Sequence, residues 1–316
     1  MHEIILRKTE YLGFSHIVNK EHSNLFGKIR RISIQGSVDN VLESINNSKI
    51  RSVSVFNVDR MRNSFMTRLV LDFKLIKVLD FENGPIEYLP EGVGNLFHLH
   101  YLSVKNTKVK VLPKSIGKLL NLKTLNLKHS LVTELPSEIN NLKKLRYLLV
   151  YRFDRSGNYE YVKIPKGFGL LLDLQKLGFV EANFEVLREL RKLRHMRKLG
   201  VRLKTGNGKD LCACIANMEK LESLIVQSTS RDGVLDIESM ASPPHCLQRL
   251  YLTGNMKKLP DWIFKLKCII RISLNLSGLT DDPIRVLQTL PNLLDLRLWD
   301  TCHDNNFISK KIGFHN

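Results

Sequence analysis

Residues 99–150 read LHYLSVKNTKVKVLPKSIGKLLNLKTLNLKHSLVTELPSEINNLKKLRYLLV and return to the same spacing of apolar residues three times. With one earlier copy, the apolar triplets are Ile76, Leu79 and Phe81; Leu99, Leu102 and Val104; Leu122, Leu125 and Leu127; and Leu145, Leu148 and Val150. Successive triplets begin 23 residues apart (99 − 76, 122 − 99 and 145 − 122), and a Leu-Pro pair lies inside each interval. A fixed period of this kind indicates a repeated structural unit.

The repeat has the pattern LxxLxLxxTxIxxLPxxIxxLxx, which is that of a leucine-rich repeat. One unit cannot bury its apolar side alone, so neighbouring units stack into a continuous core. The LxL part predicts a short strand whose positions 4 and 6 point into the core, while positions 3, 5 and 7 point to the other side. Proline then ends the extended run, and the chain returns over the outer side in irregular or short helical turns. At position 9, the hydroxyls of Thr107 and Ser130 can bond to the backbone of the turn.

Looser copies extend the array in both directions. Their triplets begin at Ile29, Ile50, Leu174, Met196, Leu221, Leu247, Ile269 and Leu293. Together with the regular copies they predict an α/β solenoid, a horseshoe whose concave parallel sheet has about a dozen short strands. The segments 151–163 and 180–240 fit the period poorly and are predicted to be irregular. The polar run 154–158 in the first of them predicts a surface loop.

Composition limits the classes of partner and compartment. The 49 Lys and Arg residues outnumber 31 Asp and Glu residues, which gives a formal charge of +18 and favours acidic partners. This charge is spread over many repeats without a polybasic arm, so we predict no nucleic-acid role. Five cysteines without a CxxC pair argue against disulfides and zinc, and favour small buried side chains. No apolar run approaches about 18 residues, which predicts no membrane span, and no signal peptide is visible.

The chain carries no motif for chemistry. GxSxG, HExxH, a GxGxxG after a strand and the phosphate-binding GxxxxGK[ST] loop are all missing from the sequence. We therefore predict a protein that is not an enzyme and that has neither a metal site nor a bound cofactor.

Positions 3, 5 and 7 of the repeats form the strand face, the concave side of the predicted solenoid. The aromatic and basic residues that they place there are Tyr101, Lys105, Lys128, Tyr147, Tyr151, Lys176, Lys198, Arg202, Arg249, Tyr251, Arg271, Arg297 and Trp299. The few acidic ones are Asp80, Glu82 and Asp295. Tyr, Trp and Arg dominate binding hot spots, although any open sheet face carries some such residues. Their clustering predicts a protein-binding face that prefers an acidic partner.

A second basic region runs from Arg188 to Lys198. Its charged residues are interleaved with Leu187, Leu190 and Leu193, a spacing that suits one buried side of an outer helix. We interpret the charges as a solvated helix surface, with a membrane or anion site as the weaker alternative.

Three stretches resemble plant intracellular immune receptors that combine coiled-coil, nucleotide-binding and leucine-rich-repeat parts. They are FEVLRELRKLRHMRKLGV (184–201), SPPHCLQRLYLTGNMKKLPDW (242–262) and the later LTDDPIRVLQTLPNLLDLRL (279–298). The start is similar to the Met-His-Asp motif that closes the family's nucleotide-binding module, with Glu3 where Asp is usual. The resemblance implies that His2 contacts a nucleotide phosphate. It also implies that residues 1–28 are a helical remnant of that module and that 29–316 are the repeat domain.

The end of the sequence, KKIGFHN, lacks a further apolar triplet, so we expect no C-terminal cap and a chain truncated at both ends. The resemblance implies a cytoplasmic module, with peripheral plasma-membrane and nuclear sites left open. It would sense a pathogen effector, or a guarded host protein that an effector modifies, and would autoinhibit its own nucleotide-binding module. ATP or ADP would bind only where that upstream module is present. The alternative is an intracellular leucine-rich-repeat signalling scaffold that binds small GTPases or phosphatases.

Overall fold

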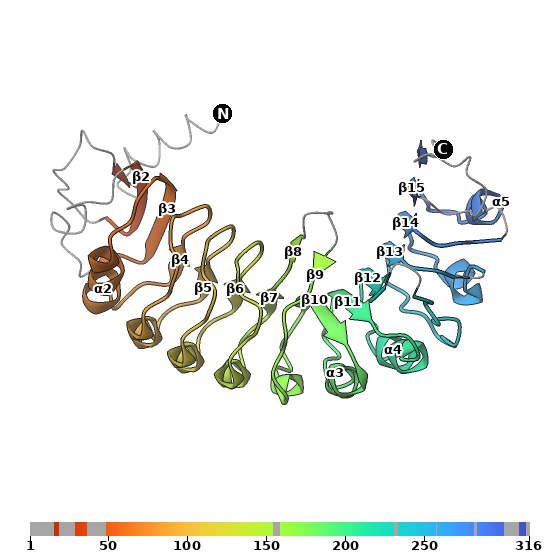
Figure 1. Ribbon diagram of the computed structural model, residues 1–316, viewed down its shortest axis with the longest axis horizontal. Coiled ribbons are helices and arrows are strands. Elements are labelled where there is room, and N and C mark those ends of the chain that lie inside the picture. The colour runs from red at the N-terminus through yellow and green to blue at the C-terminus, as the bar shows by residue number, and fades with distance from the viewer. Residues whose placement is uncertain are drawn as a thin grey trace. The chain divides into compact units, whose positions relative to one another are not determined.

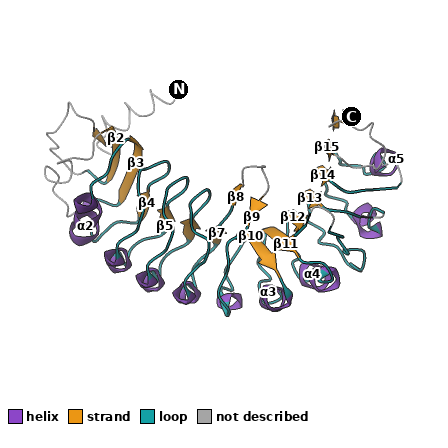
Figure 2. Cartoon of the chain, in the orientation of Figure 1, coloured by secondary structure: helices purple, strands orange, loops and turns teal. Residues whose placement is uncertain are grey.

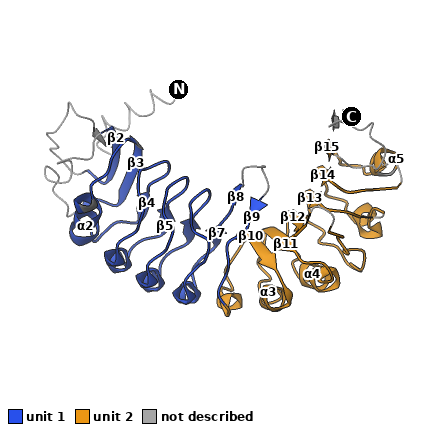
Figure 3. Cartoon of the chain, viewed as in Figure 1, with its two compact units in different colours: residues 1–165 blue, residues 166–316 orange. Residues whose placement is uncertain are grey.

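The computed structural model describes residues 16–18, 29–36, 49–153, 159–230, 233–256, 258–280, 283–299 and 310–313. The chain divides into two compact units, residues 1–165 and 166–316 (Figure 3). His2, Glu3 and the predicted loop 154–158 lie outside the described residues.

The first unit is a stack of parallel strands with helical turns on the opposite side (Figure 1). Its parallel strands are β1 (His16–Val18), β2 (Arg31–Gly36), β3 (Ser52–Val58), β4 (Val78–Asp80), β5 (Tyr101–Ser103), β6 (Thr124–Asn126) and β7 (Tyr147–Leu149). Each strand pairs in parallel with the next. The register aligns Val78, Tyr101, Thr124 and Tyr147, so residues 23 apart in sequence lie side by side. This confirms the predicted repeat register.

The helical side of this unit consists of α2 (Asn63–Asp72) and the 3₁₀ turns η2 (Glu91–Asn95), η3 (Lys114–Lys118) and η4 (Ser137–Asn141) (Figure 2). Each 3₁₀ turn starts directly after the proline of a Leu-Pro pair, which keeps extended backbone angles. The fixed φ of proline ends the incoming extended run. Its missing N–H costs nothing there, because the first N–H groups of a helical turn have no partner within the turn.

The core of the first unit is built from the repeat positions that the pattern predicts. All residues of the four regular triplets are at most 2% exposed. The Thr107 hydroxyl donates to the carbonyl of Val104 at 2.7 Å, and the Ser130 hydroxyl donates to that of Leu127 at 2.8 Å. Both hydroxyls are buried, and both confirm the predicted role of position 9.

Two parts of this unit differ from the prediction. Residues 16–18 belong to a segment expected to be helical, yet they form β1; Ile17 and Val18 are β-branched and pair with the edge of β2. In the insert after β7, β8 (Arg152–Phe153) and β9 (Tyr159–Glu160) pair antiparallel. The residues on either side of 154–158 therefore form a short β-ribbon, where an irregular segment was predicted.

The second unit has the same arrangement of strands and outer helices. Its parallel strands are β10 (Lys176–Ala182), β11 (Lys198–Leu203), β12 (Ser223–Ser228), β13 (Arg249–Thr253), β14 (Arg271–Asn275) and β15 (Asp295–Trp299), and β16 (Lys310–Gly313) pairs antiparallel with β15. Its helices are η5 (Phe168–Leu170), α3 (Phe184–Leu190), α4 (Gly208–Ala216), η6 (Asp261–Lys265) and α5 (Pro283–Leu287). All twelve predicted triplets thus contribute a strand to one unit or the other.

The segment 180–240 is more regular than predicted as far as Ser228, since β11 and β12 pair without a register shift. Its repeats lack the Leu-Pro pair, and α-helices replace the 3₁₀ turns. The first of these helices, α3, is capped by Asn183, whose side-chain oxygen accepts from the N–H of Val186 at 2.9 Å. The pairing of β16 with β15 was not predicted either, because residues 310–313 lack the LxxLxL spacing of the repeats.

Candidate protein-binding face

Within each unit, the strand face contains the side chains that the alternation predicts. On β13, β14 and β15 the core positions are buried, and the positions between them are half-buried or exposed. The predicted residues on strands are Tyr101, Tyr147, Lys176, Lys198, Arg202, Arg249, Tyr251, Arg271, Arg297 and Trp299, whereas Lys105, Lys128 and Tyr151 follow β5, β6 and β7. Trp299, with 52% of its surface exposed, is the most open of them.

The second unit aligns basic residues into a row across its strands. The register places Lys176 beside Lys198, then Ser223, Arg249, Arg271 and Asp295 in turn. Adjacent strands lie about 4.8 Å apart, so this basic row presents closely spaced cationic side chains. A partner that supplies carboxylates at a similar spacing would be matched in charge.

At the end of this row, Asp295 binds two of the predicted arginines. Arg297 donates to both carboxylate oxygens, from Nε at 3.1 Å and from Nη2 at 3.0 Å. The Nε of Arg271 lies 2.7 Å from Oδ2 and forms an ion pair with it. These arginines hold the pKa of Asp295 below its usual value, while Tyr251 and then Asp295 raise the pKa of Arg271. The positive charge of the basic row is therefore partly balanced at β15.

The Asp295 cluster predicts a pH-dependent stability. Because its pKa is lower in the folded chain than the usual 3.8, Asp295 stabilises the fold above that pH, and the contribution is lost as the pH falls through the folded value. We expect Asp295→Asn to cost about 1 kcal/mol at pH 7, since the pair is partly exposed. Urea unfolding at pH 7 and pH 3 should show a smaller pH difference in the variant. Equal pH differences in the two proteins would contradict the pairing.

In the first unit, one column of the strand face joins Glu82, Lys105, Lys128 and Tyr151, which are spaced by 23 residues. Lys105 forms an ion pair with Glu82, and this contact raises its pKa. The Nζ of Lys128 lies 5.2 Å from the ring centre of Tyr151, a cation–π contact. Burial, and then the charge of Lys105, lower the pKa of Lys128. The column therefore contains two cations, Lys105 and Lys128, and one carboxylate, Glu82.

The second basic region is solvated, as predicted, but only its start is helical: α3 ends at Leu190, a turn follows, and Lys198 is the first residue of β11. Leu187, Leu190 and Leu193 are buried. The charged residues around them form exposed ion pairs, among them Arg191 with Asp210 at 3.2 Å.

The cysteines only partly follow the prediction of small buried side chains. Cys212 and Cys214 are buried, and burial raises the pKa of the Cys214 thiol to about 11. Cys246 and Cys268 are exposed, because each lies in the turn that precedes the first apolar residue of a triplet. In the described residues, no group of His, Cys, Asp or Glu could hold a metal ion. No described helix has both the length and the apolar character needed to span a bilayer.

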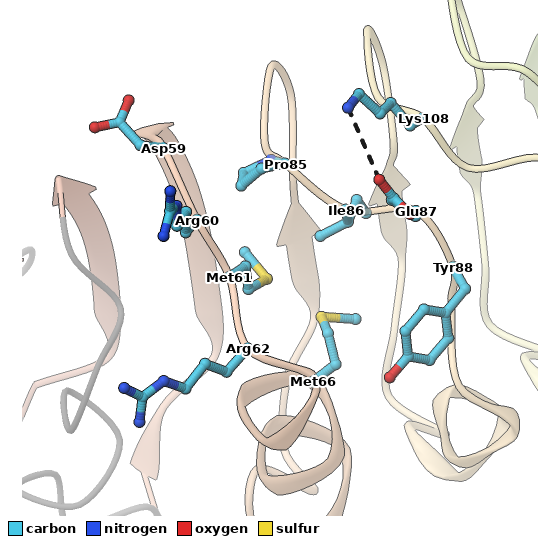
Figure 4. A pocket seen from close by; sticks show the side chains of 10 residues that line it. All are labelled: Asp59, Arg60, Met61, Arg62, Met66, Pro85, Ile86, Glu87, Tyr88 and Lys108. Carbon is cyan, nitrogen blue, oxygen red and sulfur yellow. Dashed lines mark ion pairs between the residues drawn. The ribbon is translucent and has the colours of Figure 1, made fainter.

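A hollow that the sequence did not predict lies in the first unit, where the chain leaves β3 and β4 (Figure 4). It has a volume of about 680 Å³ and is lined by Asp59, Arg60, Met61, Arg62, Met66, Pro85, Ile86, Glu87, Tyr88 and Lys108. Within it, the Nζ of Lys108 lies 3.8 Å from the Oε1 of Glu87, and the two side chains form an ion pair. Its residues belong to loops and to α2. The repeat pattern does not encode how closely these segments approach one another.

The sequence matches the family described as a leucine-rich repeat region over residues 49–316. Plant disease resistance proteins are among its relatives. Disease resistance protein RPM1 of Arabidopsis thaliana is 38% identical over 239 residues, which cover 73% of this chain and 26% of that protein. The probable disease resistance protein RXW24L of the same plant is 28% identical over 317 residues, covering 94% of this chain and 34% of that protein. The chain thus spans about a quarter to a third of the length of these curated relatives.

Solved structures share the fold. A TLR13–ssRNA13 complex aligns with a TM-score of 0.58 at 16% identity, covering 91% of this chain and 46% of that one. The internalin InlF of Listeria monocytogenes aligns with a TM-score of 0.52 at 17% identity, covering 86% and 72%. At this identity the likeness concerns the fold alone. Together with the family match it establishes a leucine-rich-repeat solenoid, a non-catalytic module.

Proposed function

The chain belongs to the leucine-rich repeat family, with plant disease resistance proteins among its relatives, and we propose that it is the recognition module of a plant intracellular immune receptor. In this proposal it binds a pathogen effector, or a host protein that an effector modifies, and holds the receptor's own nucleotide-binding module inactive. The proposed location is the cytoplasm. His2 lies outside the described residues, and its nucleotide contact is part of the same proposal.

The observation that carries the proposal is the basic row of the second unit. Lys176, Lys198, Arg249 and Arg271 lie on successive positions of a rigid sheet, interrupted only by Ser223. Rigid strands hold these side chains in place, so a partner meets several charges at once without ordering a loop. Charge complementarity of this kind selects acidic partners and disfavours basic ones.

The test is a variant in which Arg249, Arg271 and Arg297 are all replaced by Glu. Wild-type chain and variant are titrated against purified effectors, the host proteins that they modify, the nucleotide-binding module of RPM1, a small GTPase and a phosphatase. We expect at least one of the first three classes to bind the wild type and to bind the variant about 100-fold more weakly, because several favourable charges become repulsive.

The matched control reverses Arg188, Arg194 and Lys220, which are exposed and lie outside the strands. It carries the same change in net charge and should leave binding unchanged. Equal affinity of the strand-face variant for every partner would refute the proposed face. Binding to the GTPase or the phosphatase alone would count against the receptor assignment and would favour a signalling scaffold. Binding to no member of the panel would also count against the receptor assignment.

A further inference from the structure

The β-ribbon after β7 builds an aromatic cluster beside the strand face of the first unit. Its members are His129, Tyr151, Phe153 and Tyr159. The rings of Phe153 and Tyr159 have centres 4.7 Å apart, and that of His129 lies 5.2 Å from Tyr151 and 5.4 Å from Phe153. Figure 1 shows β8 and β9 on the strand side of this unit, away from its helices. The aromatic cluster is therefore separate from the buried core of the repeats.

The aromatic cluster is held in place and yet remains open. Arg152 and Glu160 oppose each other across the ribbon and form an ion pair. The N–H of His129 donates to the carbonyl of Tyr151 at 2.7 Å, which ties the two backbones together. Phe153 nevertheless has 45% of its surface exposed. Single exposed apolar side chains are ordinary, whereas an exposed ring that adjoins further half-buried rings extends the apolar surface that a partner could contact.

Two lysines adjoin these rings. Lys128 contacts the face of Tyr151, and Lys105 lies in the same column of the strand face. Glu82 forms an ion pair with Lys105, whereas the ammonium of Lys128 lies over a ring, and Lys105 lowers the pKa of Lys128 more than Glu82 raises it. An anion supplied by a partner would balance the remaining positive charge of the two lysines.

We propose that the aromatic cluster, together with Lys105 and Lys128, is a docking subsite for a partner segment that carries Asp or Glu beside an aromatic side chain. The carboxylate pairs with Lys128 and offsets its repulsion from Lys105. The aromatic side chain stacks on the exposed ring of Phe153. This subsite rests on the proposed function, because it specifies which part of an acidic partner the first unit binds.

The experiment titrates the full chain with three labelled peptides and follows fluorescence anisotropy. The first peptide alternates Glu and Phe, the second replaces Phe by Ala, and the third replaces Glu by Gln. We expect the first to bind at least about tenfold more tightly than either of the others, because only it supplies both groups.

Two variants and two controls locate the binding. Phe153→Ala and Lys128→Gln should each weaken binding of the Glu/Phe peptide by about tenfold, since each removes one of the two contacts. Phe97→Ala and Lys110→Gln change exposed residues of the same types elsewhere in the unit and should have no effect. Phe153 is not in the core, so its truncation leaves the fold intact.

The outcomes separate this inference from the proposed function. Equal affinities of the three peptides, absence of binding, or affinity insensitive to Phe153→Ala would each overturn the subsite. If the Glu/Ala peptide binds and loses affinity only in the strand-face arginine variant, the acidic-partner proposal stands and the aromatic subsite is wrong. If the arginine variant leaves every protein partner unaffected, the proposed face itself fails.

Discussion

Replacing Gly208 with alanine is expected to lower the free energy of unfolding by about 3 kcal/mol or more. Gly208 is the first residue of α4 and is buried. A Cβ at this position would overlap the carbonyl group of Asp236 and would lie 3.1 Å from its Cα. These are backbone atoms of a neighbouring segment, so no rotamer change can relieve the overlap, and the segment itself must move.

Gly206 provides the matched control two residues away. Its φ of +87° is strained for alanine, but nothing lies within 4 Å of its Cβ position. Gly206→Ala should therefore cost only about 1 kcal/mol, the penalty for the left-handed backbone. Urea unfolding followed by circular dichroism measures both variants. Equal losses would show that α4 and Asp236 are not in close contact.

The regular part of the fold could be predicted from the sequence because each repeat position has one environment. A spacing of 23 residues places Leu102, Leu125 and Leu148 on adjacent strands, and all three are fully buried. The prediction extended to looser copies because the LxxLxL spacing of the strand alone was enough to identify them. It was weaker for the outer side, where α3 and α4 replace 3₁₀ turns once the Leu-Pro pair is missing.

The segment 233–240 shows why some of the outer side could not be predicted. It has no helix, yet Leu235, Ile237 and Met240 are buried. Its position depends on contacts from other repeats, such as the N–H of Leu235, which donates to the carbonyl of Asn255 at 2.8 Å. No period within the segment encodes those contacts.

For the candidate binding face, the positions of the residues could be predicted from the sequence, but the contacts between their side chains could not. Alternation along a strand is enough to place Arg249 and Tyr251 on the strand face, because its period of two is a property of the backbone. Pairing between side chains is not encoded in this way, and neither the double contact of Arg297 with Asp295 nor the aromatic cluster was predicted. Both depend on side-chain positions that the alternation leaves open.

A second large effect is expected from Trp262→Ala, which should cost about 3–5 kcal/mol. Trp262 lies in η6, is 1% exposed and is among the largest fully buried side chains. Its Nε1 donates to the carbonyl of Ile237 at 2.7 Å. Truncation would leave a cavity where the segment 233–240 packs against η6, and it would remove this hydrogen bond. Urea unfolding again measures the loss.

Trp262→Phe separates the two contributions. Phenylalanine keeps most of the buried ring area but cannot donate, so the expected cost is about 1–2 kcal/mol, the range for a buried carbonyl that loses its partner. That carbonyl retains a weaker contact with the thiol of Cys212 at 3.4 Å, which limits the loss. The chain has two tryptophans, so the emission that remains in Trp262→Phe comes from Trp299, which is exposed, and should shift to longer wavelength. If Ala and Phe at position 262 destabilise equally, the hydrogen bond and not the buried ring positions the segment 233–240.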